Sequence, residues 1–284
     1  MPINFTEIEV VSFDQYRAEI GRLEGAFLFR GQTNDWPLAH SLERRLAVWG
    51  IPLSDAPEIE RLLIRDFCRK AGPEINPLIQ SDTLYCLSVM QHHGAPTRLL
   101  DVTYSPYVAA KFAFDGAGVE GVIWCFQYSW LLHTTARAVG GDLVRRRNID
   151  EHRNNESYEE MYGSLPPRAF VFSENPFLLN QRSIIQKGAF LCPGNVAVTM
   201  EENFSEIRSD DPQPGIVKLK LNLNRAETLN FAEQLRRMNV SSAVLFPGLD
   251  GFSRALGEEV FLYADLARTL TGRPDYIDPI EIAP

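Results

Sequence analysis

Long apolar runs and paired cysteines are both missing from the sequence. No run of about 18 apolar residues is present, and the first residues lack a basic segment followed by an apolar one, so neither a membrane span nor a secretory signal is predicted. The four cysteines lie far apart without the paired spacing of metal ligands, which predicts buried reduced thiols. We therefore expect a cytoplasmic protein without membrane association and without a bound metal.

Positive charge is also scarce. The chain has 28 Lys and Arg residues against 37 Asp and Glu residues, for a formal net charge of -9. Because binding to a nucleic-acid backbone requires a surplus of cations, we expect no general affinity for DNA. The basic triplet at residues 145–147 is interpreted as a solvated face. No glycine-rich phosphate loop is present, which disfavours a doubly wound nucleotide-binding sheet.

The apolar content is sufficient for a substantial core. The 284 residues are 45% hydrophobic and 11% aromatic, and they predict a single domain over residues 1–284, with a core at about residues 25–255. Residues 140–168 are polar and charged and are expected to form a long, partly helical surface excursion. Residues 271–284 are expected to be a loosely attached tail.

A charged residue follows the first buried strand that the pattern predicts. Residues 26–29 are a short apolar run that ends in Arg30, Gly31 and Gln32. Two interpretations of Arg30 are open. It forms a structural ion pair, or it serves a ligand, which its position between an apolar strand and a glycine favours.

Two histidines follow a helix predicted at residues 81–90. Their place at the C-terminal end of that helix favours a protonated imidazole. His92 is therefore a candidate acid or base, although a purely structural role for both histidines remains open.

The next polar groups lie at a junction between a strand and a helix. Residues 97–102 predict the strand, and Ser105 followed by proline predicts the start of the helix. The free amides of that helix, with Thr103 and Ser105, would face an anion such as a phosphate. Alternatively, Ser105 only caps the helix. Arg98 and Asp101 either contribute to this site or pair with each other in the core.

Arg182 and Gln186 stand beside a later strand-like run. Gln186 would present its amide to a ligand or satisfy a buried backbone group. The remaining patterns predict strands at residues 215–221 and 243–246 and helices at residues 225–238 and 252–266.

Several motifs in order resemble the FRG domain, a family named for its Phe-Arg-Gly motif. They are Phe29-Arg30-Gly31, the stretch QHHGAPTRLLD at residues 91–101, and Ser105-Pro106 with the alanines and phenylalanines that follow. Gln186-x-Gly188-x-Phe190 and LFPGLDG at residues 245–251 also resemble the family, so the resemblance covers about residues 25–255. The motif order is similar to that of the Arg-Ser-Glu class of ADP-ribosyltransferases.

This resemblance implies an α+β fold of the ADP-ribosyltransferase type. Two small, mostly antiparallel sheets would face a cleft, with a helical segment at the N-terminus. It also implies a site for NAD, as substrate, or for a related nucleotide. The residues assigned to nucleotide binding are Arg30, Gly31, Gln32, Arg98, Thr103, Ser105 and Arg182. A guanidinium such as that of Arg30 binds pyrophosphate in a bidentate manner.

The catalytic assignment falls on His92, Asp101 and Gln186. Cleavage of the nicotinamide-ribose bond passes through an oxocarbenium-like state that a nearby carboxylate stabilises. By motif order, Gln186 occupies the position where the transferases have a glutamate, and a neutral amide cannot provide this charge. Either Asp101 supplies it, with His92 as acid or base, or the fold keeps a nucleotide pocket without the reaction.

The function expected from the resemblance is an ADP-ribosyltransferase or NAD glycohydrolase. Such an enzyme would bind NAD or a related nucleotide and transfer or hydrolyse ADP-ribose, with a protein, a nucleic acid or water as acceptor. The alternative is a non-catalytic module that senses a nucleotide or a nucleic-acid end in a bacterial defence or stress circuit. A third interpretation, a protein-interaction scaffold, predicts no pocket at Arg30 and Asp101.

Overall fold

Seven strands form one mostly antiparallel sheet in the described part of the chain. The computed structural model describes residues 4–71, 77–114, 120–149, 155–176, 178–205 and 215–260, together with residues 263, 267 and 270. The strands are β1 (Thr6–Val10), β2 (Phe27–Gln32), β3 (Leu100–Thr103), β4 (Glu120–Gln127), β5 (Val171–Glu174), β6 (Gly188–Pro193) and β7 (Ile216–Asn222). Their order is β1-β7-β4-β2-β3-β6-β5, in which β1 and β7 pair in parallel and the other neighbours are antiparallel. The α+β class is confirmed.

The sheet narrows at one point, between β2 and β3. These strands pair through Phe29 and Thr103, whereas β2 pairs with β4 along its whole length, from Phe27 to Gln32. The narrow point divides the sheet into a first half-sheet (β1, β7, β4 and β2) and a second half-sheet (β3, β6 and β5). The expectation of two separate sheets was wrong for the described residues, because the pair at this junction keeps the halves continuous.

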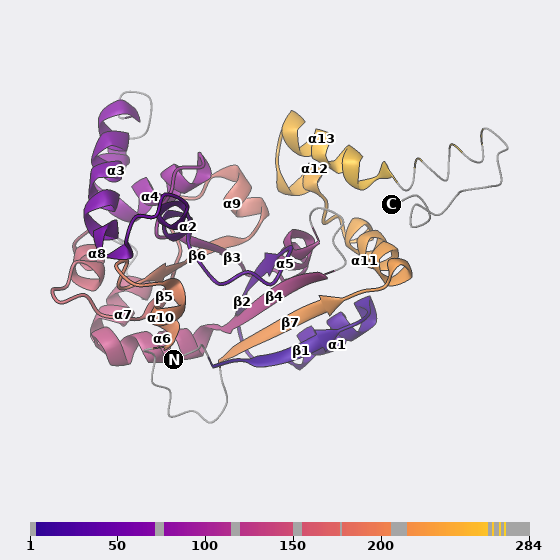
Figure 1. Ribbon diagram of the computed structural model, residues 1–284, viewed down its shortest axis with the longest axis horizontal. Helices are drawn as coiled ribbons and strands as arrows, with labels where there is room; N and C mark the ends of the chain where they lie inside the picture. Colours follow the sequence, from indigo (N-terminus) through magenta and orange to yellow (C-terminus); the bar gives the residue numbers. More distant parts are fainter. Residues whose placement is uncertain are drawn as a thin grey trace.

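Helices cover both half-sheets (Figure 1). The helical elements are α1 (Phe13–Arg22), α2 (Ser41–Val48), η1 (Leu53–Asp55), α3 (Ala56–Ala71), η2 (Pro77–Gln80), α4 (Thr83–His92), α5 (Pro106–Ala113), α6 (Tyr128–Val139), α7 (Gly141–Ile149), α8 (Asn155–Tyr162), α9 (Gln181–Ile185), α10 (Met200–Ser205), α11 (Arg225–Arg237), α12 (Ser242–Leu245) and α13 (Leu249–Glu258). One apolar cluster joins α1, α5 and α11 to the first half-sheet. Another joins α4, α7 and α8 to the second.

The segment at residues 140–168 differs from the expected surface excursion. It contains α7 and α8, and Tyr158 and Met161 of α8 are buried in the core of the second half-sheet. Within the basic triplet, Arg147 is only 1% exposed, because its guanidinium pairs with the buried Glu174 at 2.9 Å. The interpretation of the triplet as a solvated face was therefore wrong for Arg147. A buried partner on a distant strand lets an arginine enter the core.

The strand expected at residues 243–246 was also wrong. Ser242–Leu245 form the short helix α12, which leads into α13. A run of four apolar residues has no period of its own, so tertiary contacts decide between helix and strand. The tail expected at residues 271–284 lies outside the described residues.

Candidate functional site

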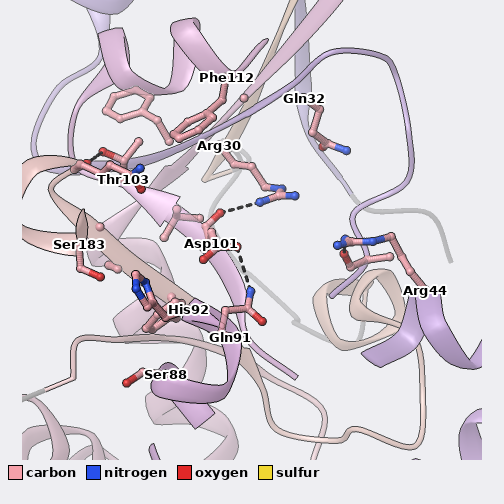
Figure 2. Close-up of a pocket in the computed structure, with 18 of the residues that line it drawn as sticks. Arg30, Gln32, Arg44, Ser88, Gln91, His92, Asp101, Thr103, Phe112 and Ser183 are labelled. Atoms are coloured by element: carbon pink, nitrogen blue, oxygen red, sulfur yellow. Dashed lines mark hydrogen bonds between the residues drawn. The ribbon is translucent and has the colours of Figure 1, made fainter. Parts of the chain in front are cut away.

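A cavity of about 880 Å³ opens at the junction of the two half-sheets (Figure 2). Its walls come from β2, β3 and β6 and from α2, α4, α5 and α9. The lining includes these residues that the sequence assigned to a site: Arg30, Gly31, Gln32, His92, Asp101, Thr103, Arg182 and Gln186. The scaffold interpretation, which predicts no pocket at Arg30 and Asp101, is contradicted.

Arg30 brings a partly buried cation into the cavity from β2. Its Nη1 donates to the backbone carbonyl of Asp101 at 2.8 Å, and its buried Nε has no hydrogen-bond partner among the described residues (Figure 2). Burial lowers the pKa of Arg30 to about 10, with Asp101 raising it and Arg44 lowering it. The side chain is therefore still charged at neutral pH. A carbonyl partner does not neutralise this charge, so the expected alternative of a structural ion pair is not what the described residues form.

Gly31 and Gln32 take opposite faces of β2, as alternation along a strand requires. A Cβ at Gly31 would lie 1.8 Å from the carbonyl oxygen of Ala109, so only glycine lets α5 pack this closely on the strand. Gln32 shares the face of Arg30 and is 7% exposed. Its Nε2 donates to the carbonyl of Trp36 at 3.2 Å, and its buried Oε1 has no partner among the described residues.

Asp101 is an exposed carboxylate that a neighbouring amide holds in place. Its Oδ2 accepts a hydrogen bond from Gln91 Nε2 at 2.9 Å (Figure 2). The Gln91 amide is itself oriented, because its Oε1 accepts from the hydroxyls of Thr97 at 2.6 Å and Ser41 at 3.1 Å. Gln91 thus keeps its donor side turned to Asp101. Sequence reasoning included Gln91 in a motif but gave it no role.

His92 lies at the end of α4 and is exposed on the cavity wall. Its pKa is lowered, first by partial burial and then by the nearby His93 and Arg182. The expectation that the helix end favours a protonated imidazole was therefore wrong for His92. Desolvation is the first cause of the lowered pKa, because it disfavours the charged form. At neutral pH, a neutral His92 is suited to accept a proton rather than to donate one.

Arg182 and Gln186 reach the cavity from the short helix α9. The guanidinium of Arg182 lies over the ring of Phe246, 4.5 Å from its centroid, and burial lowers its pKa. Gln186 ends α9 rather than lying on a strand, and its Nε2 donates to the carbonyl of Leu245 at 3.0 Å. Of the two interpretations of Gln186, the structure favours the one in which its amide bonds to a backbone group.

Thr103 lines the cavity, but its hydroxyl has protein partners. The buried Oγ1 donates to the carbonyl of Gln186 at 2.7 Å and accepts from the Ser105 amide at 3.0 Å. It therefore ties the junction of the half-sheets to α9.

Arg98 and Ser105, also assigned to nucleotide binding, are not among the cavity-lining residues. Arg98 is buried, and its Nε donates to both carboxylate oxygens of Glu60, at 2.9 and 2.8 Å. The alternative in which Arg98 pairs with Asp101 in the core was therefore wrong, because the partner of Arg98 is Glu60. Ser105 accepts from the Val108 amide at 3.3 Å, so its interpretation as the cap of α5 is confirmed.

Sequence reasoning missed Glu43 and Arg44, both of which line the cavity from α2. The Glu43 side chain is 13% exposed, and its Oε2 accepts from the Met200 amide at 3.1 Å and faces His40 Nε2 at 3.7 Å. Burial, with Glu201, raises the pKa of Glu43 to about 7 against the opposing amides of Met200 and His40 and the charge of Arg44. His40 is fully buried and neutral, since burial lowers its pKa to about 3.

Other kinds of site are not found in the described residues. No group of three or more His, Cys, Asp or Glu side chains there is placed to hold a metal ion. Over the same residues, no helix has the length and apolar character that crossing a membrane would need.

Comparison with known families gives a match over part of the chain. Residues 25–120 match the model of the FRG domain. The chain contains an FRG domain. The match includes Arg30, Gln91 and Asp101, whereas Arg182 and Gln186 lie beyond it. The FRG domain thus supplies β2, β3 and much of the cavity wall. Searches of curated proteins and of solved structures found no match.

Proposed function

We propose that this chain is a cytoplasmic enzyme that binds NAD or a related nucleotide and transfers or hydrolyses its ADP-ribose. The observation that carries the proposal is Arg30, a charged guanidinium in the cavity wall whose Nε lacks a hydrogen-bond partner among the described residues. A guanidinium without a carboxylate partner suits a bidentate contact with phosphate oxygens. Arg44 and Arg182 line the same cavity and would add to the attraction for a pyrophosphate.

The arrangement of the sheet supports the likeness to an ADP-ribosyltransferase fold. The cavity coincides with the narrow pair between β2 and β3, so the two half-sheets flank it much as two separate sheets would flank a cleft. The proposed ligand would lie across the ends of these halves.

Asp101 and His92 are assigned the chemical steps in this proposal. Asp101, held by Gln91, would stabilise the positive charge that develops on the ribose as the bond to nicotinamide breaks. His92, with its lowered pKa, would accept the proton of the attacking water or acceptor. A bound NAD supplies the cleavable bond to nicotinamide.

The test is incubation of the purified protein with NAD, with nicotinamide release followed by chromatography and NAD binding by calorimetry. We expect both in the wild type, and loss of both in Arg30→Ala. Arg61→Ala is the matched control, because Arg61 is exposed and pairs with Glu58 within one helix. Absence of binding and release with NAD and with other nucleotides would refute the proposal.

One observation favours a second function, a nucleotide sensor without catalysis. The amide of Gln186, at the position expected for a catalytic glutamate, is bonded to the backbone of Leu245. A sensor would bind a nucleotide and return it unchanged. Calorimetry followed by chromatography of the recovered ligand separates the two functions, since an enzyme leaves free nicotinamide after long incubation and a sensor does not.

A further inference from the structure

Trp36 is an exposed aromatic side chain in the wall of the cavity. It is 55% exposed and lies four residues beyond Gln32, the last residue of β2. An indole ring of this kind exposes a large apolar surface to water, and contact with a flat partner would remove much of that surface. Trp49, at the end of α2, is even more exposed, at 71%, but does not line the cavity.

The turn that carries Trp36 is held at several points. The side chain of Gln32 donates to the Trp36 carbonyl at 3.2 Å, and the Trp36 amide donates to the Asn34 carbonyl at 2.9 Å. The neighbouring Asp35 pairs with the largely buried Lys218 at 2.8 Å. Two residues later, Leu38 is fully buried in the core. The backbone that carries the ring is therefore fixed at the cavity, which lowers the entropic cost of binding a ligand against the ring.

Polar groups suited to the rest of a nucleotide line the same cavity as this ring. Gln32, which holds the Trp36 carbonyl, has a buried Oε1 without a partner among the described residues. Such an acceptor fits an amino group at the edge of a base. Arg30 shares the face of β2 with Gln32 and offers its guanidinium to a phosphate.

We infer that Trp36 is the stacking platform for the base of the bound nucleotide. The ligand is then a nucleoside diphosphate or its sugar ester with a planar, amino-bearing base, rather than a free pyrophosphate or a sugar phosphate. This inference rests on the proposed function, which places the phosphates at Arg30. It adds a binding site for the base, the part of the ligand that determines specificity. Base stacking on an aromatic side chain tolerates different bases, while the Gln32 acceptor selects among them.

The experiment compares the binding of ADP and of inorganic pyrophosphate to four proteins by calorimetry. These are the wild type, Trp36→Ala, Trp36→Phe and the control Trp49→Ala. Because the Trp36 side chain is exposed, all four are expected to fold with similar melting temperatures. We expect Trp36→Ala to weaken ADP binding by at least about fivefold and to leave pyrophosphate binding within about twofold. Trp36→Phe retains a ring and should fall between, whereas Trp49→Ala should match the wild type.

Equal affinity of the wild type and Trp36→Ala for ADP would overturn the inference, as would an equal loss for ADP and pyrophosphate. Loss in Trp49→Ala as large as in Trp36→Ala would also overturn it. The proposed function is judged separately by nicotinamide release. ADP binding that depends on Trp36, without any cleavage of NAD, supports the inference and refutes the enzyme. No binding of any nucleotide by the wild type refutes both.

Discussion

Arg98 and Arg30 belong to neighbouring parts of the FRG domain and lie in opposite environments. Arg98 donates to both oxygens of Glu60 in the core; burial lowers its pKa, but Glu60 raises it, and the net pKa is well above the ordinary value. Arg30 has a backbone carbonyl as its partner, and burial lowers its pKa to about 10. The protein therefore neutralises the charge of Arg98 and leaves the charge of Arg30 without a carboxylate partner in the described residues.

The same contrast separates two regions of the molecule. In the core of the second half-sheet, Arg147 forms an ion pair with Glu174. The Oε1 of Glu174 also accepts a hydrogen bond from the hydroxyl of Tyr162 at 2.9 Å. At the junction, Arg30 and Arg182 face a cavity. A buried charge is tolerated when it is paired. Arg30 lies in the cavity wall without a carboxylate partner among the described residues, which is why we propose that it binds a ligand.

The largest effect on stability is expected from breaking the buried ion pair of Arg98 and Glu60. Glu60→Ala leaves the buried guanidinium of Arg98 uncompensated and should lower the free energy of unfolding by about 3–5 kcal/mol. Urea denaturation measures this loss. Glu58→Ala is the matched control on the same helix, because Glu58 is exposed, and its effect on the free energy of unfolding should be much smaller than that of Glu60→Ala. Similar losses of stability in Glu60→Ala and Glu58→Ala would contradict the view that the buried pair of Arg98 matters more than an exposed one.

A smaller effect on stability is expected at Gly31, where β2 packs against α5. Gly31→Ala places a Cβ against the backbone of α5, and the forced separation should destabilise the protein by about 1–3 kcal/mol. Gly21→Ala is the control, since a Cβ on Gly21, in α1, would meet nothing within 4 Å among the described residues. The melting temperatures of both variants decide the prediction, and an unchanged value for Gly31→Ala would contradict it.

The pH dependence of stability tests the raised pKa of Glu43, which lines the cavity. The pKa of Glu43 is raised from 4.5 to about 7 on folding, so the folded state binds more protons between these values. The contribution of Glu43 to stability is therefore fully present below about pH 4.5 and is lost as pH rises to about 7. Allowing for partial exposure, the loss should be about 1–2 kcal/mol.

Comparison of the wild type with Glu43→Gln isolates this contribution. The difference in unfolding free energy between the two proteins should change from pH 5 to pH 7 and then level off, as measured by urea denaturation at each pH. A difference that is constant with pH would show that Glu43 titrates at its ordinary value.

The smallest change in stability is expected from Arg30→Ala. Because Arg30 has no carboxylate partner among the described residues, its removal leaves no unpaired buried anion, and the free energy of unfolding should change by less than about 1 kcal/mol. Thermal denaturation measures the change. A loss as large as that of Glu60→Ala would return Arg30 to a structural role and remove the basis for the proposed ligand site.

Local signals in the sequence predicted much of the framework. The cap at Ser105, the strand before Arg30 and the helix before His92 each depend on residues within one or two turns, and each is found. A single cleft for the assigned residues was predicted through the resemblance in motif order to the ADP-ribosyltransferases, and most of these residues line one cavity.

Contacts between distant residues could not be predicted in this way. Glu60 lies 38 positions before Arg98, so nothing near Arg98 identifies its partner. The pKa of Glu43 is raised by burial and by Glu201 of α10, and no residue near Glu43 in the sequence indicates either cause. The sequence shows a glutamine at position 186 but not where its amide points. That direction depends on a hydrogen bond to the carbonyl of Leu245 in α12.

The alternation of β2 has a consequence for protein engineering. Phe29 and Gly31 face α5, and Arg30 and Gln32 face the cavity. Insertion or deletion of a single residue ahead of Arg30 within the strand would exchange these faces. An insertion would move Arg30 to the position of Gly31, where the α5 backbone leaves no room for a Cβ. A deletion would move Gly31 to the position of Arg30, so the cavity wall would lose the guanidinium. The tripeptide Phe29-Arg30-Gly31 can therefore be transferred to another strand only if its register is kept, with Arg30 on the cavity face.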